Sequence, residues 1–456
     1  MTNSLGRRSF LKTTAATGAL LSAPIIQGKA QTKKFRTATI GCGWWGLNIT
    51  KNAIASGETE IVGLCDVDQS PSRDLDTVHR EDVPGYDASR PYLEKAQQMV
   101  EALCGDKPRL YTDYREMLEK EKPEIVIVGT PDHWHALPTI DAVKAGAHVY
   151  VEKPVCHTVL EGKAMVDAAR KYNRVVQVGT HRRLAVHNTS AMKFLWEGHA
   201  GKIGSIKAFV VSGYGGDHRT EDSDPPQGLD WDLWCGPGPL VPFNSRMHPK
   251  GFRQFMDFGN GQLGDWGIHW MDQILWWAKD EITPHTIFSS GGRFTRTEDN
   301  TNSPDTQNAN FAFDNLSVTW EHRFYAGNPQ EKTSIGCYFY GTKGVLHLGW
   351  LDGWTFYPSG RGEKEVHEDC VFHNKDKENI KEVFADLLDA IKTNRRPACD
   401  IEYGYRASCM SLIANISLKI GRSVAWDQKN SQILNDPEAS KLLRRDYRAP
   451  WVFPEV

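Results

Sequence analysis

The sequence predicts an α/β protein in which a parallel, helix-flanked sheet precedes a second domain rich in β-strands. Three observations support this: apolar strand runs alternate with helical runs after residue 33, a glycine-rich turn follows the first run, and β-branched segments dominate residues 205–340. The 456 residues suit two or three domains, and no apolar stretch reaches 18 residues, which excludes a polytopic membrane protein. The net charge of −3 argues against nucleic acid as a partner.

Residues 1–30 have the features of a twin-arginine export signal. Arg7 and Arg8 precede a Phe-Leu pair, a mildly apolar run follows to Ile26, and small residues surround Lys29. The alternative is a membrane anchor, but the run is short and rich in Thr and Ala. We therefore expect a periplasmic protein without stable membrane insertion after the signal is cleaved.

A dinucleotide-binding unit is expected at residues 35–66. A β-branched run over 35–40 leads into a glycine turn, a helix over 47–56 and a second strand ending before Asp66. Gly41 permits the tight turn, Gly43 lets the backbone approach a pyrophosphate, and Gly46 allows close helix–strand packing. Asp66 can accept the ribose hydroxyls of NAD and would repel the extra phosphate of NADP, so NAD is favoured over NADP. The alternative is a glycine turn without a ligand.

The next strands place further polar residues at the edge where ligands bind in such sheets. Residues 124–129 and 148–151 are buried-strand runs. Thr130-Pro131 follows the first run, and Glu152-Lys153-Pro154 follows the second. The carboxyl ends of parallel strands form the ligand-binding edge, so Lys153 lies where a reacting group belongs. Alternatively, Lys153 is a solvated strand end. Bulky Trp44 and Trp45 in the glycine turn are expected to cover the pyrophosphate.

The second half reads as a sheet with two late helices. Strands are expected at 205–214, 286–294, 309–313, 316–324 and 333–340, with a hairpin turn at Asp314-Asn315, and helices at 380–391 and 405–419. The Gly- and Pro-rich stretch 215–262 is expected to be a functional or covering loop. Nine scattered cysteines without a Cys-x-x-Cys pair indicate neither a disulfide framework nor a zinc site.

Asp265 and His269 are candidate catalytic residues. They are four residues apart, so their side chains share one face if this segment is helical. A dinucleotide that accepts a hydride from a substrate hydroxyl carbon needs a base for the hydroxyl proton, and His269 is the natural base near neutral pH. Lys153 would polarise the substrate oxygen, and Asp265 would orient the hydroxyl. The alternative for His269 is a satisfied core residue. A metal held by the nearby histidines and Asp265 is not expected, so no metal is predicted.

Four residues are candidate substrate ligands. Arg183 follows a strand over 175–179 and is either a site residue or a surface charge. Trp231 and Trp234 could stack on the C–H faces of a sugar, or pack within their loop. Asp272 is either a substrate ligand or a salt-bridge partner within its helix.

These motifs together resemble the Gfo/Idh/MocA oxidoreductases. The similarity extends from about Lys33 to Trp426 and rests on four motifs: Gly41-x-Gly43-x-x-Gly46, Thr130-Pro131-x-x-x-His135, Glu152-Lys153-Pro154, and Asp265-x-Gly267-x-His269-x-x-Asp272. The resemblance implies a Rossmann domain over 33–155 and an α+β domain with an open, mostly antiparallel sheet over 156–430, followed by a tail over 431–456. It also implies that Lys153, Asp265 and His269 are catalytic and that Thr130, Pro131, His135, Glu152 and Lys153 belong to the cofactor site. Separately, because an open sheet has an exposed face, we expect copies of the chain to form homo-oligomers through that sheet.

The resemblance implies an NAD(P)-dependent oxidoreductase acting on a secondary hydroxyl of a sugar or cyclitol. An exported enzyme has no ready pool of NAD, so we expect a tightly held cofactor that is recycled internally. Two alternatives remain open: a redox-neutral NAD-dependent glycoside hydrolase, and an exported sugar-binding protein with an inert dinucleotide fold.

Overall fold

The computed structural model describes residues 33–75, 83–213, 216–327, 333–371 and 380–456. Residues 34–456 form one compact unit. The predicted export signal lies outside the described residues. In the described part of the chain, no helix combines the length and apolar character that crossing a membrane requires.

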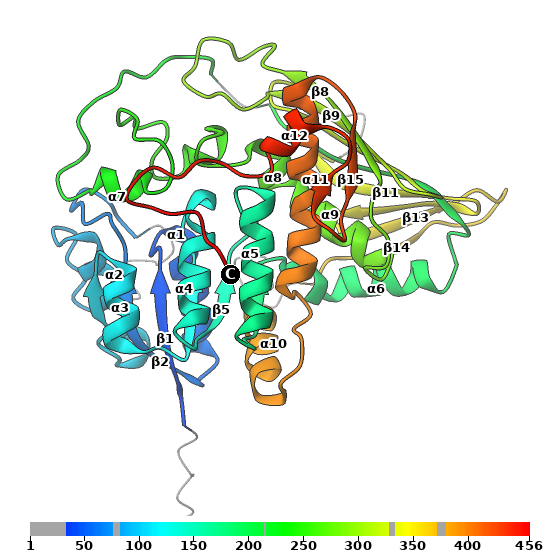
Figure 1. The fold of residues 1–456 in the computed structure, drawn as a ribbon. Helices are drawn as coiled ribbons and strands as arrows, with labels where there is room; N and C mark the ends of the chain where they lie inside the picture. The colour runs from blue at the N-terminus through cyan, green and yellow to red at the C-terminus, as the bar shows by residue number, and fades with distance from the viewer. Residues whose placement is uncertain (1–32, 76–82, 214–215, 328–332, 372–379) are drawn as a thin grey trace, which may run out of the picture. The chain divides into compact units, whose positions relative to one another are not determined.

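The first sheet is parallel, with strand order β3-β2-β1-β4-β5-β6 (Figure 1). Its strands are β1 (Phe35–Ile40), β2 (Thr59–Cys65), β3 (Arg109–Tyr111), β4 (Ile125–Val128), β5 (His148–Val151) and β6 (Val176–Val178). Successive strands are added on one side of β1 up to β3 and on its other side from β4 onward. Such sheets bind ligands at this change in strand order, between β1 and β4. Because β6 pairs with β5, this sheet continues past the boundary that the sequence predicts at residue 155.

Helices cover both faces of this sheet, since both faces of each central strand are apolar. Ile125 and Ile127 pack toward α1 and α10, whereas Val126 and Val128 pack in a cluster with α3, α4 and α5. Helix α10 belongs to the second half of the sequence but covers the first sheet. The helices are α1 (Trp44–Ala55), α2 (Tyr92–Cys104), α3 (Tyr114–Glu121), α4 (Ala136–Lys144), α5 (Val159–Lys171) and α10 (Ile380–Thr393).

The second sheet has ten strands in the order β14-β13-β12-β11-β7-β10-β9-β8-β15-β16. All pairs are antiparallel except β10 with β7. The strands are β7 (Ile203–Val211), β8 (Thr286–Gly292), β9 (Thr306–Ala312), β10 (Ser317–Arg323), β11 (Ile335–Gly341), β12 (Gly344–Gly349), β13 (Trp354–Pro358), β14 (Val366–Glu368), β15 (Val424–Asp427) and β16 (Gln432–Ile433). The predicted fold class, with a mostly antiparallel second sheet, is confirmed.

One face of the second sheet packs against helices and the other is more open. Along β10, buried and less buried residues alternate, as a half-buried strand requires. The buried side packs in one cluster with helices α9 (Gly267–Trp277) and α11 (Ile401–Ile420). Phe288 and Tyr340 are among the large side chains that stay exposed. Assembly of copies through this sheet stays a prediction.

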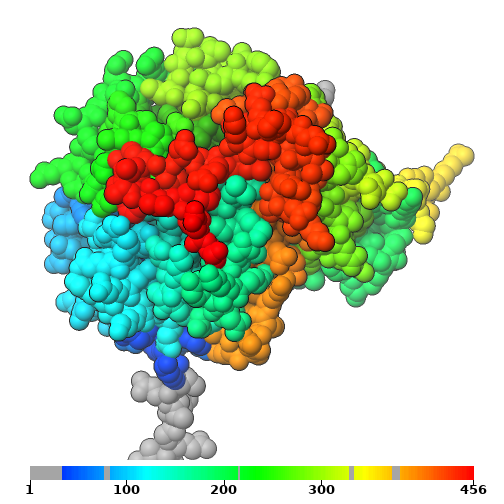
Figure 2. All heavy atoms as spheres, in the orientation of Figure 1, coloured from blue at the N-terminus to red at the C-terminus, as the bar shows by residue number. Residues whose placement is uncertain are grey.

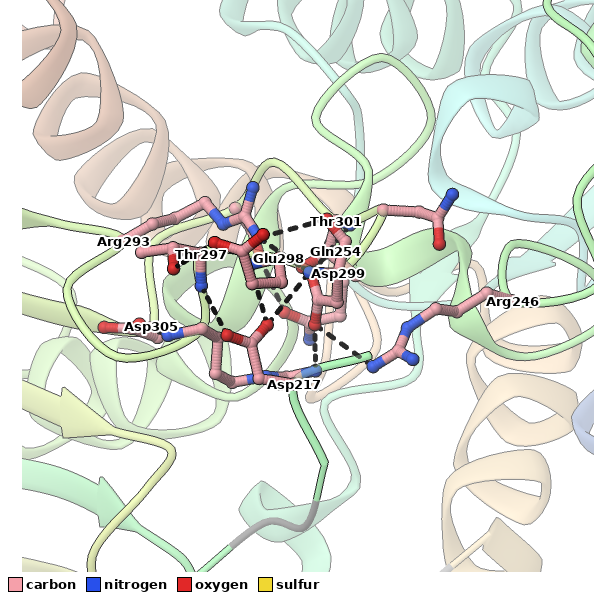
Figure 3. Close-up of polar contacts among 12 residues, drawn as sticks. Asp217, Arg246, Gln254, Arg293, Thr297, Glu298, Asp299, Thr301 and Asp305 are labelled. Atoms are coloured by element: carbon pink, nitrogen blue, oxygen red, sulfur yellow. Dashed lines mark hydrogen bonds and ion pairs between the residues drawn. The ribbon is translucent and has the colours of Figure 1, made fainter. Parts of the chain in front are cut away.

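The long stretch after β7, predicted as a loop, contains short helices. It contains α7 (Trp231–Cys235), η4 (Gly251–Gln254) and the start of α8 (Gly261–Asp265), and it has a hydrophobic cluster of its own. Figure 3 shows how its first part is attached to the β8–β9 loop. Asp217 accepts the backbone N–H groups of residues 297–299, and buried Asp299 forms ion pairs with Arg246, Arg293 and Arg296. These contacts fix the position of the segment that leads into the site.

Candidate functional site

A cavity of about 310 Å³ lies beyond the carboxyl ends of the parallel strands. Nine of the predicted cofactor residues line it: Gly41, Gly43, Trp44, Trp45, Asp66, Thr130, Pro131, Glu152 and Lys153. All three predicted catalytic residues, Lys153, Asp265 and His269, line it as well. The structure therefore brings together the glycine turn and the residues expected to do the chemistry.

The glycine turn has the geometry that a dinucleotide requires. Gly41 has a φ of +82°, and a Cβ there would lie 2.6 Å from the backbone nitrogen of Thr130. A Cβ on Gly46 would lie 1.9 Å from the carbonyl oxygen of Gly41, so Gly46 serves packing and does not line the cavity. Gly43 caps α1 without a side-chain hydrogen bond, which leaves the N–H groups at the start of the helix available for phosphates. These residues fit a dinucleotide.

Asp66 lies at the end of β2, beside an arginine that the sequence analysis did not single out. Arg73 donates to Asp68 at 3.0 Å, lies 3.9 Å from Asp66 and packs over the ring of Tyr92. Burial raises the pKa of Asp66, and the charge of Arg73 opposes that rise. Arg73 lines the cavity, so the carboxyl group of Asp66 and the guanidinium of Arg73 both border the cavity beyond the end of β2.

Lys153 and Asp265 pair at the end of the cavity that holds the predicted catalytic residues. The Lys153 Nζ donates to Asp265 Oδ1 at 2.6 Å and to the Asp265 carbonyl at 3.1 Å. The Arg253 Nε donates to the same Oδ1 at 3.2 Å. Burial acts against ionisation, but Lys153 and Arg253 outweigh it and hold the pKa of Asp265 below its ordinary value. Asp265 is therefore a carboxylate that positions the ammonium group of Lys153.

His269 lies in the same cavity as a neutral, buried imidazole. Its pKa is held well below the ordinary value by burial and by the charge of Lys153. The predicted single helix is interrupted at Trp266, with α8 ending at Asp265 and α9 starting at Gly267. The His269 Nδ1 is buried and has no hydrogen-bond partner among the described residues. A neutral imidazole at this position can accept a proton from a substrate hydroxyl.

Side chains from distant parts of the chain complete this end of the cavity. His181 and Trp350 contact the His269 ring, with ring centroids at 5.5 Å and 4.9 Å. Arg182 packs over the Trp350 ring at 3.5 Å. The sequence predicts Arg183 as a site residue, whereas the structure places His181, two residues earlier, at the cavity. No sequence motif marks Trp350 as a site residue; it directly follows β12 of the second sheet.

Asp132 is a further carboxyl group in the cavity that the sequence analysis missed. It follows β4 within the 3-10 turn η2 (Asp132–Trp134), is buried, and lines the cavity. Its Oδ2 has no hydrogen-bond partner among the described residues. Burial raises the pKa of Asp132 to about 7, and the charge of Asp265 adds to the rise. A carboxyl group in this state can donate or accept a proton near neutral pH.

Arg183 and Asp272 do not line the cavity. The Arg183 Nε donates to both Asp272 oxygens, at 2.8 Å and 3.0 Å, and its other nitrogens donate to Asp280 at 2.8 Å. The structure therefore places them in a buried ion pair. Asp272 is a salt-bridge partner, as its alternative predicts, but of an arginine outside its own helix. The register explains the difference, since His181 of the same turn points to the cavity while Arg183 contacts α9.

Two other predicted site residues, Trp231 and His135, also do not line the cavity. Trp234 lines the cavity, whereas Trp231 stacks on Trp234 at 4.4 Å within the cluster of the long segment. His135 does not line the cavity either; its ring nitrogens Nε2 and Nδ1 lie 2.9 Å and 2.7 Å from the carbonyl oxygens of Thr130 and Pro154. His135 thus joins the ends of β4 and β5 and positions the residues that do reach the site.

Two family models match this chain. Residues 35–180 match the NAD-binding Rossmann fold of the GFO_IDH_MocA oxidoreductase family, and residues 203–293 and 370–453 match the C-terminal alpha/beta domain of that family. The chain belongs to the Gfo/Idh/MocA oxidoreductase family, as its motifs predict. The first match ends after β6, in agreement with the extent of the parallel sheet.

Curated relatives match parts of the chain. Levoglucosan dehydrogenase of Pseudarthrobacter phenanthrenivorans is 32% identical over 39% of this chain and 39% of its own length. Glycosyl hydrolase family 109 protein 1 of Akkermansia muciniphila is 29% identical over 30% of this chain and 25% of its own. D-glucoside 3-dehydrogenase of Escherichia coli is 26% identical over 55% of this chain and 65% of its own. The matches thus span less than two thirds of each relative.

Solved structures share the fold over most of the chain. The WlbA dehydrogenase of Bordetella pertussis, in complex with NADH and UDP-GlcNAcA, has a TM-score of 0.59 at 17% identity and covers 87% of this chain and 99% of its own. Myo-inositol 2-dehydrogenase of Lactobacillus plantarum has a TM-score of 0.58 at 18% identity and covers 87% and 100%. At these identities the likeness concerns the fold.

Proposed function

We propose that this protein is an NAD(P)-dependent oxidoreductase that oxidises a secondary hydroxyl of a sugar or cyclitol. The observation that carries the proposal is the convergence of Lys153, Asp265 and His269 in the cavity that the glycine turn borders. The relatives named as levoglucosan and D-glucoside 3-dehydrogenases support a carbohydrate substrate.

Each residue has a distinct chemical task. When bound, the nicotinamide supplies the hydride acceptor. His269, neutral because of its burial, takes the proton of the hydroxyl group. Lys153 donates a hydrogen bond to the same oxygen and stabilises the charge that develops there. Asp265 keeps Lys153 in place and offsets its charge.

The test uses the purified protein with a panel of sugars, cyclitols and alkyl glycosides while nicotinamide absorbance is followed. We expect one class to change the nicotinamide redox state, and His269→Asn to abolish the change while retaining NADH binding. His199→Asn is the matched control, because His199 is an exposed histidine paired with Glu197 outside the cavity. Full turnover by His269→Asn would contradict the assigned role.

NAD is the proposed cofactor, because Asp66 would accept ribose hydroxyls and repel a phosphate. Arg73 lies 3.9 Å from Asp66 and would weaken that repulsion, so the preference is tested directly. We expect NADH to bind more tightly than NADPH in a fluorescence titration, and Asp66→Ser to narrow the difference. An equal affinity of the parent protein for both would overturn the preference for NAD.

Periplasmic location and a retained, internally recycled cofactor follow from the predicted export signal. The supporting pattern is Arg7-Arg8 with its apolar run, and the physical reason is the absence of an exchangeable NAD pool outside the cytoplasm. Cell fractionation and mass spectrometry of the nucleotide that co-purifies test both parts. Cytoplasmic protein free of nucleotide would overturn them.

A second candidate function is redox-neutral glycoside hydrolysis. Asp132 favours it, because transient oxidation followed by elimination and water addition needs a further acid or base beside His269. The family 109 relatives also favour it. Cleavage of a nitrophenyl glycoside without net NADH would support this route. Sugar binding without either reaction would instead indicate an inert dinucleotide fold.

Association of copies through the second sheet is also proposed. Exposed Phe288 and Tyr340 lie on strands of this sheet and would be covered by a second copy. Light scattering should give a mass above that of one chain, and Phe288→Lys should lower it. A monomeric parent protein would overturn this proposal.

A further inference from the structure

The C-terminal strap, residues 445–451, is attached first to the domain that carries the parallel sheet. The Arg445 Nε donates to Glu161 at 2.9 Å, and its Nη2 donates to the carbonyl oxygen of His133 at 2.7 Å. The Tyr447 hydroxyl donates to the same Glu161 oxygen at 2.6 Å. Because Glu161 on α5 is buried, these hydrogen bonds hold the strap to the interior of the domain and are not an exposed surface ion pair.

The strap is attached a second time, to the long segment after β7. The Arg448 guanidinium donates to the side chain and the carbonyl of Asp232, at 2.7 Å and 2.8 Å, and to the carbonyls of Gly236 and Gly238, each at 3.2 Å. Figure 1 shows the red chain end running from α12 (Pro437–Lys441) past α7 and back to the first domain, and Figure 2 shows it at the surface between green and cyan segments. The strap thus bridges two parts of the cavity wall.

Trp451 at the end of the strap lines the cavity. Its ring packs edge-on against Trp134 at 4.7 Å, and Arg115 lies over it at 4.8 Å. Its indole Nε1 is buried and has no hydrogen-bond partner among the described residues. Tyr114, which follows β3, lines the same cavity and contacts Trp134. Trp451 therefore borders the part of the cavity beside the N-terminal ends of α3 and α4.

The strand order places the adenosine toward the β3 side of this part of the cavity, where Arg115 at the start of α3 lies over Trp451. The pyrophosphate turn follows β1, and Lys153 follows β5 on one side of it, so the nicotinamide lies on that side. The other half of the dinucleotide must extend toward Asp66 and Thr112, which follow β2 and β3 and line the cavity. We propose that Trp451 is a nucleotide-binding residue that closes the adenosine end, and that the strap retains the cofactor. This inference rests on the proposed nucleotide binding.

The test measures how fast NADH leaves the full-length protein when excess NAD⁺ is added, followed by nicotinamide fluorescence. Aromatic contacts with a base are strong enough that Trp451→Ala should speed release by about tenfold. Val452→Ala is the control, because Val452 follows Trp451 in the same tail, is 77% exposed and does not line the cavity. Its release rate should stay within about twofold of the parent, a change too small to count as a lost contact.

Trp451→Leu guards against a folding defect, since it keeps an apolar contact with Trp134 but removes the aromatic face. We expect it to melt like the parent and still release NADH faster. Parent-like release by both Trp451 variants would overturn the role of the strap while leaving nucleotide binding intact. A parent protein that binds neither NADH nor NADPH would overturn the proposed function and this inference together.

Discussion

Removing the charge of Asp272 should destabilise the fold without changing how substrate binds. Arg183 and Asp272 are only 3% and 1% exposed, and two hydrogen bonds of 2.8 Å and 3.0 Å join them. Replacing one partner of such a pair leaves the other charge buried and incompletely compensated, which costs about 3–5 kcal/mol. Asp280 still pairs with Arg183, so we expect Asp272→Asn to fall at the low end, about 3 kcal/mol.

The assay is a denaturant or thermal melt of Asp272→Asn beside the parent, together with KM for whichever sugar is turned over. Asp167→Asn is the control, because Asp167 forms an exposed pair with Lys163 on α5 and its loss should cost less than about 1 kcal/mol. An unchanged melt with a strongly raised KM would refute this reasoning. It would return Arg183 and Asp272 to the substrate-ligand role that the sequence alone suggests.

Two further predictions concern the cavity. Gly43→Ala should weaken NADH binding by about tenfold or more with little loss of stability, because the added Cβ meets only the flexible end of Arg73, at 3.1 Å, but fills the space where a pyrophosphate approaches. Gly204→Ala, whose Cβ meets nothing within 4 Å, is its control in the same fluorescence titration, and equal affinities would count against the glycine turn as the phosphate site. Burial raises the pKa of Asp132 from 3.8 to about 7, so the folded state binds a proton that the unfolded chain releases, and stability should fall as the pH rises through that interval. Asp132→Asn should melt with a flatter pH dependence over the same interval, and identical profiles for variant and parent would contradict a raised pKa in the folded protein.

Several fold elements could be read from the sequence because they depend on neighbouring residues. The run at 125–128 is apolar at every position, since both of its faces are covered, and it forms β4 as expected. The predicted helix at 405–419 lies within α11, which begins four residues earlier. The short strands β12, β13 and β14 were missed, because runs of three to six residues carry little periodic signal.

Local patterns also determined the glycine turn and the place of Lys153, since a turn or a strand end is set within a few residues. What only the tertiary structure decided is which side chains meet there. Lys153 and Asp265 are 112 residues apart, yet one hydrogen bond of 2.6 Å joins them. Trp350 reaches the same cavity from the end of β12, and Trp451 from the C-terminal strap. Such contacts leave no repeat in the sequence, because they depend on how whole elements pack and not on the spacing of neighbours.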